Sequence, residues 1–132
     1  MTIAELNEVR DLRAELNREL DRQRSLEAAI DGLTSMIDGL PRSQSSTSRT
    51  EKLATLLVDT SEIIRRLNER IITASVALTE KIFTADLSNV ERDILIQRYV
   101  KCLSFKRMAS EINLSTDYVF RLHRSALKKT VR

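Results

Sequence analysis

The chain has 132 residues with a formal net charge of +3, and its few glycines (2), prolines (1) and aromatic residues (4%) favour an all-α fold. One cysteine and one histidine exclude an internal disulfide and a Cys/His metal site, so we expect no metal and no cofactor. No apolar run approaches the roughly 20 residues that a membrane span needs, which predicts a cytoplasmic protein without a membrane partner.

The first expected element is a long amphipathic helix that begins at residue 2. Thr2 and Glu5 have the spacing of a capping box, and Gly39 and Pro41 mark the end of the helix. Its apolar residues recur three, four or six apart: Ile3, Leu6, Val9, Leu12, Leu16, Leu20, Leu26, Ile30, Leu33, Ile37 and Leu40. This spacing predicts one apolar face along the helix.

A second long helix is expected after a loop at residues 41–50, which are rich in serine and threonine. Ser48 and Glu51 repeat the capping-box spacing at its start. Its seam alternates steps of four and three residues: Leu53, Leu57, Thr60, Ile64, Leu67, Ile71, Ala74 and Leu78. Because the loop is short, we expect residues 1–85 to form an antiparallel, coiled-coil-like hairpin for packing or oligomerisation.

Several apolar residues of the second helix lie outside this seam and need a further covering surface. That surface is either the C-terminal domain or another subunit, and the sequence leaves both open. The apolar residues outside the seam are Leu56, Ile63, Ile72 and Ile82.

On the first helix, the charges between Arg10 and Arg24 alternate in sign, which is typical of a solvated face rather than a nucleic-acid patch.

Residues 86–132 are expected to form three short helices, each preceded by a capping serine: Ser88 (with Glu91), Ser104 and Ser115. Asn113 suits a left-handed turn between the second and third helices. The expected core is Val90, Ile94, Leu95, Met108, Ile112, Leu114, Val119, Leu122 and Leu127. A helix pair of this kind presents its second helix to the major groove of DNA.

The charge balance differs between the two segments. Residues 86–132 contain ten Lys and Arg against five Asp and Glu, a balance of +5, whereas residues 1–85 contain twelve against fourteen, a balance of −2. Binding to phosphates releases condensed counterions, and this release supplies most of the non-specific affinity for DNA. The sequence therefore places a phosphate-binding module at the C-terminal end.

The run from Leu103 to Lys129 resembles region 4 of bacterial sigma-70 factors. The resemblance begins with the opening Leu-Ser-x-Val-Glu-Arg-Asp-Ile-Leu at residues 87–95. Its further elements are Arg98-Tyr99, Ser104, Met108-Ala109, Leu114-Ser115, Val119 and Ala126-Leu127. It covers about a third of the chain. With the hairpin in front, the whole chain resembles the small phage-encoded regulators of late transcription of the ArpU/RinA type.

This resemblance implies a sequence-specific transcription regulator whose partner is double-stranded DNA. It leaves open whether RNA polymerase is a second partner. The resemblance covers neither region 2 nor region 3 of sigma factors, which implies a regulator or accessory factor rather than a complete sigma factor. The family usually carries an acidic residue before the Ile-Ala pair of the second helix, whereas this chain has Lys106 and Arg107 there.

The third expected helix carries the side chains suited to reading bases. Arg can donate two hydrogen bonds to guanine, Asp can accept one from cytosine, and Thr or Tyr can contact a thymine methyl. Phe120 has a second interpretation, in which it docks against the hairpin. The expected base or groove contacts are Thr116, Asp117, Tyr118, Phe120, Arg121 and Arg124.

Other side chains lie where phosphates would pass, because helix starts and flanking basic residues fix the register of a protein on the duplex. The expected phosphate contacts are Ser104, Lys106, Arg107, Lys128 and Lys129.

Cys102 and His123 are expected to be structural, since neither has a ligand or base partner nearby in the sequence.

Three functions remain open at this point: a DNA-binding transcription regulator, a DNA-packaging subunit similar to a phage small terminase, and a structural coiled-coil assembly protein. A ring of many subunits would favour packaging, whereas a monomer or dimer would favour regulation. The sequence contains no nucleophile with a base, no paired carboxylates in an apolar setting and no glycine-rich phosphate loop, so we expect no enzyme and no catalytic residues.

Overall fold

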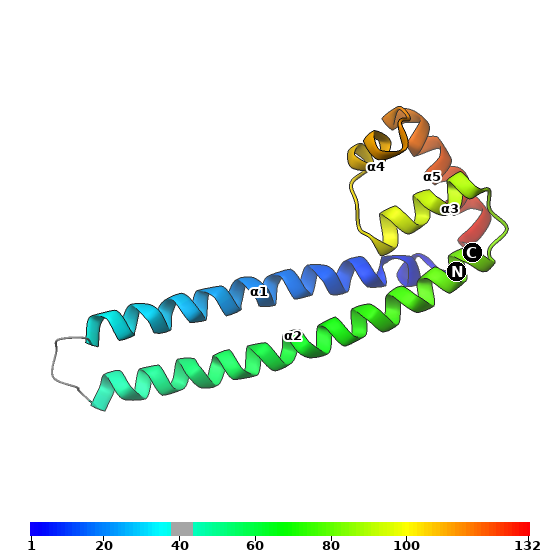
Figure 1. Ribbon diagram of the computed structural model, residues 1–132. Helices are drawn as coiled ribbons and strands as arrows, with labels where there is room; N and C mark the ends of the chain where they lie inside the picture. Colours follow the sequence, from blue (N-terminus) through cyan, green and yellow to red (C-terminus); the bar gives the residue numbers. More distant parts are fainter. Residues whose placement is uncertain (38–43) are drawn as a thin grey trace. The chain divides into compact units, whose positions relative to one another are not determined.

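The structure is a computed structural model that describes the backbone of residues 1–37 and 44–132 and the side chains of residues 1–34 and 48–132. These residues form helices and no strand, which confirms the expected all-α fold (Figure 1). Among the described helices, none combines the length and the hydropathy of a membrane span. The elements are α1 (Ile3–Ile37), α2 (Gln44–Thr84), α3 (Asn89–Leu95), the π-helix η1 (Ile96–Val100), α4 (Phe105–Ile112) and α5 (Thr116–Thr130).

The chain divides into two compact units. Unit 1 comprises Met1–Arg13 and Arg70–Arg132, and unit 2 comprises Ala14–Glu69. Unit 1 therefore contains the first turns of α1 and the last turns of α2 together with all of the C-terminal helices. The expected domain boundary between residues 85 and 86 falls inside this unit.

In unit 2, the segments of α1 and α2 lie side by side and run antiparallel (Figure 1). The Gln23 amide nitrogen on α1 donates to the Ser61 hydroxyl on α2 at 3.2 Å. Thr60 and Leu67 are buried, whereas the other described seam residues of this unit are half-buried. Two helices packed together leave part of each seam open to solvent, which accounts for the incomplete burial.

The seam at the start of α1 and the end of α2 is enclosed far more completely in unit 1. Leu6, Val9 and Ile82 are 1%, 0% and 0% exposed. These residues share a compact unit with the C-terminal helices, whereas unit 2 contains only α1 and α2. The Lys81 ammonium also pairs with the Glu5 carboxylate at 3.2 Å, which joins α2 to α1.

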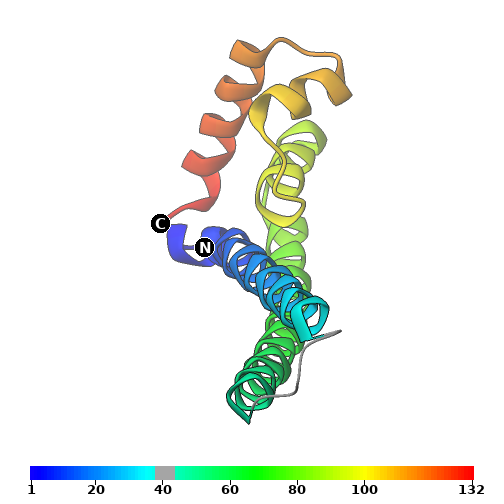
Figure 2. The same ribbon diagram turned by 90° about the vertical axis from the view of Figure 1, so that its left-hand side faces the viewer.

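The two ends of the chain lie next to each other within unit 1 (Figures 1 and 2). The backbone N–H of Arg132 donates to the carbonyl of Met1 at 3.1 Å. Residues far apart in the sequence therefore close unit 1 into one body.

The seam expected on the second helix is confirmed, since no residue in the series from Leu53 to Leu78 is exposed. On α1, Ile3 is wrong as a seam residue, because it is 61% exposed. A step of three residues falls about 60° short of a full turn, so Ile3 lies about 120° from Val9 and leaves the buried face. Ile82 is covered inside unit 1, whereas Leu56, Ile63 and Ile72 are exposed.

The expected capping box at the start of α1 is confirmed. The Thr2 hydroxyl accepts from the Glu5 N–H at 3.1 Å, and the Glu5 carboxylate accepts from the Thr2 N–H at 3.2 Å. These two bonds satisfy backbone donors that have no partner within the first turn of a helix.

The expected start of the second helix is wrong. Because α2 begins at Gln44, Ser48 lies inside the helix, and the loop expected at residues 41–50 is helical from residue 44 onward. Serine and threonine disfavour a helix interior only weakly, by at most about 0.7 kcal/mol each, so a long helix can extend through them. Residues 38–43 lie outside the described residues, and with them the end expected at Gly39 and Pro41.

The core beneath the C-terminal helices is built from α3, α4 and α5. Its most buried members are Ile94, Met108, Ala109 and Val119, and Leu103, Phe105, Ile112, Leu114 and Leu122 pack against them. Val90 is wrong as a core residue, since it is 40% exposed. Glu91, about 100° further round the helix, is the residue that faces inward, and it is 3% exposed.

Candidate nucleic-acid interface

The pair α4 and α5 is set by two serine caps and one left-handed residue, as expected. The hydroxyl of Ser104 accepts from the Arg107 N–H, and that of Ser115 accepts from the Tyr118 N–H, each at 3.2 Å. Asn113 has φ 59° and ψ 40°, and its N–H donates to the Ala109 carbonyl. Asparagine tolerates this backbone conformation better than most residues, so the chain can end α4 and begin α5 within a few residues.

One line of charged side chains runs along the solvent-facing side of α5. Asp117, Arg121, Arg124 and Lys128 follow one another in steps of four, three and four residues, and all four are exposed. Steps of this size keep side chains on one face of a helix with 3.6 residues per turn. The opposite face carries the buried side chains Val119, Ala126 and Thr130.

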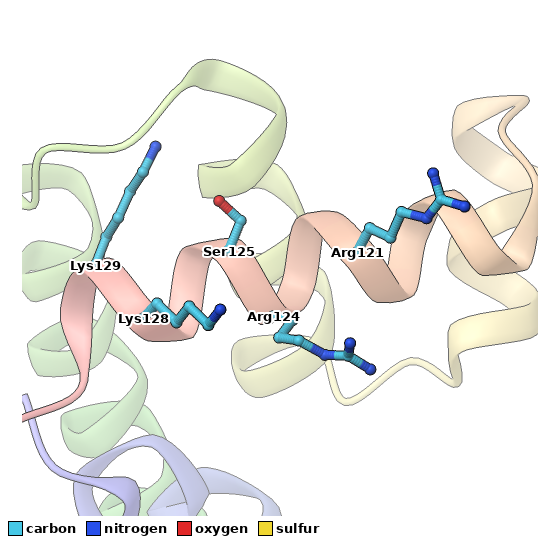
Figure 3. Close-up of a pocket in the computed structure, with 5 residues that line it drawn as sticks. All are labelled: Arg121, Arg124, Ser125, Lys128 and Lys129. Carbon is cyan, nitrogen blue, oxygen red and sulfur yellow. The ribbon is translucent and has the colours of Figure 1, made fainter.

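The cations of this line border an open cleft (Figure 3). Within residues 1–34 and 48–132, Arg121, Arg124 and Lys128 form no ion pair. Their charged groups are thus available to an anion, and guanidinium groups match the geometry of phosphate oxygens well. The cleft is lined by Arg121, Arg124, Ser125, Lys128 and Lys129.

Lys129, which is expected as a phosphate contact, is paired with a buried carboxylate on α3. Its ammonium lies 2.8 Å from Glu91 Oε1, and the Ser125 hydroxyl donates to Glu91 Oε2 at 3.0 Å. In Figure 3 both side chains point toward the start of α3, whereas Arg124 points away from it. The hydrogen bond from Lys129, supported by those from Ser88 and Ser125 and opposed by burial, lowers the pKa of Glu91 from 4.5 to about 2.

The inner side of α5 is attached to η1 through His123. The Nε2 atom of His123 lies 2.7 Å from the Tyr99 hydroxyl, at hydrogen-bonding distance. Burial lowers the pKa of His123, and the positive charges of Arg98 and Arg10 lower it further. His123 thus fixes the position of the helix rather than facing the cleft.

Phe120 packs within the helix pair. Its ring lies 4.6 Å from that of Phe105 on α4, measured between centroids, and it remains 42% exposed. The rings of Phe105 and His123 form a T-shaped pair with their centroids 4.9 Å apart. These contacts use one side of Phe120 to join α5 to α4 and leave its other side open to solvent.

The remaining expected site residues are exposed but do not line the cleft. Thr116, Asp117 and Tyr118 occupy the first turn of α5, while Lys106 and Arg107 occupy the first turn of α4. Arg107 forms an ion pair with Glu111 at 3.4 Å. The Ser104 hydroxyl is engaged as the α4 cap, so it serves the fold directly.

The π-helix η1 and the turn after it were not expected from the sequence. The Lys101 N–H donates to the Ile96 carbonyl at 3.0 Å, and Cys102 adopts a left-handed φ of 59°. Arg98 supports the turn, because it donates to the Leu103 carbonyl at 3.1 Å and lies 4.3 Å from the centre of the Phe105 ring. No glycine or proline marks this segment in the sequence, so local composition gives no signal for it.

Comparisons with protein-family models, with curated proteins and with solved structures find no match for this chain. The resemblance to sigma region 4 rests on the residues quoted from the sequence.

Proposed function

We propose that this protein is a sequence-specific, double-stranded DNA-binding transcription regulator of the kind that the sigma region 4 and ArpU/RinA resemblances imply. One observation carries the proposal: Arg121, Arg124 and Lys128 form an exposed line, without ion pairs to any described residue, on the second helix of a tightly turned helix pair. In a helix-turn-helix, this helix enters the major groove.

The charged side chains along α5 match the hydrogen-bond donors and acceptors on the base edges of a DNA groove. Arg121 can donate two hydrogen bonds to guanine O6 and N7, and Asp117 can accept one from the amino group of cytosine. Lys128, toward the end of the helix, suits a phosphate of the backbone. A single helix face thus combines groups for reading bases with groups for fixing register.

A binding titration of the full-length Arg121→Ala variant tests this proposal. On a duplex selected from a random library, the loss of a base contact should cost about 1–3 kcal/mol, whereas affinity for random duplex should change little. Arg18→Ala is the matched control, because Arg18 is also exposed and forms no ion pair among the described residues but lies in unit 2.

Two results would contradict the proposal. If the wild-type chain selects no sequence and shows no salt-dependent binding to duplex DNA, DNA recognition is the wrong function. If Arg18→Ala weakens binding as much as Arg121→Ala does, the exposed face of α5 is the wrong surface. Equal losses on selected and random duplexes would remove the base-reading role of Arg121.

A packaging subunit similar to a phage small terminase is the second candidate. The exposed apolar side chains of α2 favour self-association, since Ile72, Val76 and Phe83 are 65%, 55% and 60% exposed within unit 1. Light scattering after size exclusion separates the candidates. A ring of many subunits would support packaging, and a monomer or dimer would support regulation.

A further inference from the structure

The start of α3 carries a carboxylate that is almost completely enclosed. Glu91 is 3% exposed, and its two oxygens accept hydrogen bonds from the Ser88 N–H, the Ser125 hydroxyl and the Lys129 ammonium. The distances are 3.2, 3.0 and 2.8 Å. Ser88 belongs to the cap of α3, whereas Ser125 and Lys129 belong to α5, so this one side chain joins the two helices.

Removing the ammonium of Lys129 from this site would be costly. A buried carboxylate that loses its partner keeps its charge without compensation, which strongly destabilises a folded protein. A DNA phosphate that recruited Lys129 would create that situation at Glu91. We therefore expect the ammonium to stay with Glu91 when an anion approaches the cleft.

Lys128 is the natural comparison, because it is the preceding residue on the same helix. It lies about 100° round the helix from Lys129, on the line of Arg121 and Arg124, and it forms no ion pair among the described side chains. No partner has to be given up when Lys128 meets a phosphate. The two adjacent lysines thus differ in availability although both line the cleft.

We propose that Lys128 contacts a DNA phosphate, whereas Lys129, Ser125 and Glu91 are positioning residues that fix how α5 presents its recognition face. This inference rests on the proposed DNA-binding function. Ser125 and Lys129 are four residues apart on α5 and are held by the same carboxylate, so α5 cannot rotate about its axis without breaking one of these contacts. The orientation of Arg121 and Arg124 is set in this way from α3.

The salt dependence of DNA binding separates the two roles. Each phosphate contact contributes about 0.9 to the slope of log affinity against log salt. Between 50 and 200 mM salt, the affinity of Lys128→Ala should therefore fall about 3.5-fold less than that of the wild-type chain. A merely structural change would shift affinity at both salt concentrations without changing this ratio.

The matched variant is Glu91→Gln/Lys129→Met, measured in the full chain. It removes both charges together, so no buried carboxylate is left unpaired, whereas Lys129→Ala alone can unfold the unit. We expect the double variant to keep the wild-type salt slope while losing affinity for a selected duplex. Unfolding of both single variants and the double variant by urea should show that the effects of Glu91 and Lys129 are not additive.

The outcomes distinguish this inference from the function on which it rests. A double variant whose slope falls as that of Lys128→Ala does would show that Lys129 contacts phosphate, and additive effects in urea would show that the pair is not formed. Either result overturns the inference alone. A wild-type chain without salt-dependent binding to duplex DNA would overturn both the proposed function and the inference.

Discussion

At the scale of single residues, the folded state depends on charges whose partners are distant in the sequence. Glu91 and Lys129 are 38 residues apart, and their ion pair lies where α3 and α5 meet. The exposed pair of Glu62 and Arg65 is local by comparison, with the partners three residues apart on α2. A local exposed pair contributes little to stability, whereas breaking a buried pair is expensive.

Glu91 should make unit 1 sensitive to acid. Because its pKa is lowered from 4.5 to about 2, chiefly by Lys129, the unfolded chain binds this proton at a higher pH than the folded chain does. The stabilisation is thus complete above about pH 5 and is lost as the pH falls from about 4.5 through about 2. Melting temperatures of the wild-type chain and Glu91→Gln should differ most at neutral pH and converge over that range.

Glu62→Gln serves as the control for this measurement. Arg65 lowers the pKa of Glu62 to about 2 as well, but the Glu62 side chain is 43% exposed and solvent screens the pair. Its melting temperature should stay close to that of the wild-type chain at every pH. A Glu91→Gln difference that persists unchanged at pH 2 would show that the Glu91 carboxylate is not held in its charged form by the fold.

At the scale of helices and turns, the link between α4 and α5 depends on the left-handed conformation of Asn113. A β-branched side chain at this position clashes with the backbone, so Asn113→Val should destabilise unit 1 by about 1–2 kcal/mol. Asn113→Gly is the matched control, since glycine adopts this conformation without strain. Urea midpoints of the two variants provide the measurement, and equal midpoints would show that the turn does not require this conformation.

The sequence predicts those features of the elements that depend on neighbours a few residues away. The caps at Thr2, Ser88, Ser104 and Ser115 use partners three residues on, and the seam of α2 follows from its own periodicity. The start of α2 was misplaced because the Ser48 spacing fits a cap equally well inside a helix. A capping pattern therefore identifies a helix more securely than it locates its first residue.

The candidate site likewise has features that local sequence predicts and features that depend on distant residues. The exposed residues of α5, such as Arg121 and Lys128, follow from helical periodicity and were predicted. The ion pair of Lys129 with Glu91 joins residues 38 positions apart, and the contact of His123 with Tyr99 joins residues 24 positions apart. No local sequence pattern predicts either pair. The sequence does not predict the π-helix η1, because a change from i→i+4 to i→i+5 hydrogen bonds within a helix requires no particular residue type.

At the scale of the whole molecule, the two compact units divide the hairpin itself. The first turns of α1 and the last turns of α2 supply Leu6, Val9 and Ile82 to the interior of unit 1, where each is at most 1% exposed. Residues 86–132 lack all three. With about 47 residues, that segment alone lies close to the lower limit of about 40 residues for an independent fold.

This division leads to a test by shortening the chain. Replacing residues 14–69 with a glycine- and serine-rich linker of about six residues should leave unit 1 folded, because the ion pair of Glu5 with Lys81 sets a register that brings Arg13 near Arg70. Packed helices lie about 8–10 Å apart, and six extended residues can span about 20 Å. The shortened chain should melt cooperatively and bind duplex DNA with the salt slope of the full chain.

Two comparison fragments make this prediction decisive. The fragment of residues 86–132 should be only marginally folded and should bind more weakly, since it keeps the cations of α5 but loses the cover from α1 and α2. Residues 1–85 should not bind DNA, because their charge balance is −2. If the shortened chain unfolds while residues 86–132 melt cooperatively, the first turns of α1 are not part of the folding unit. If residues 1–85 bind as tightly as the full chain does, the DNA-binding surface does not lie on α5.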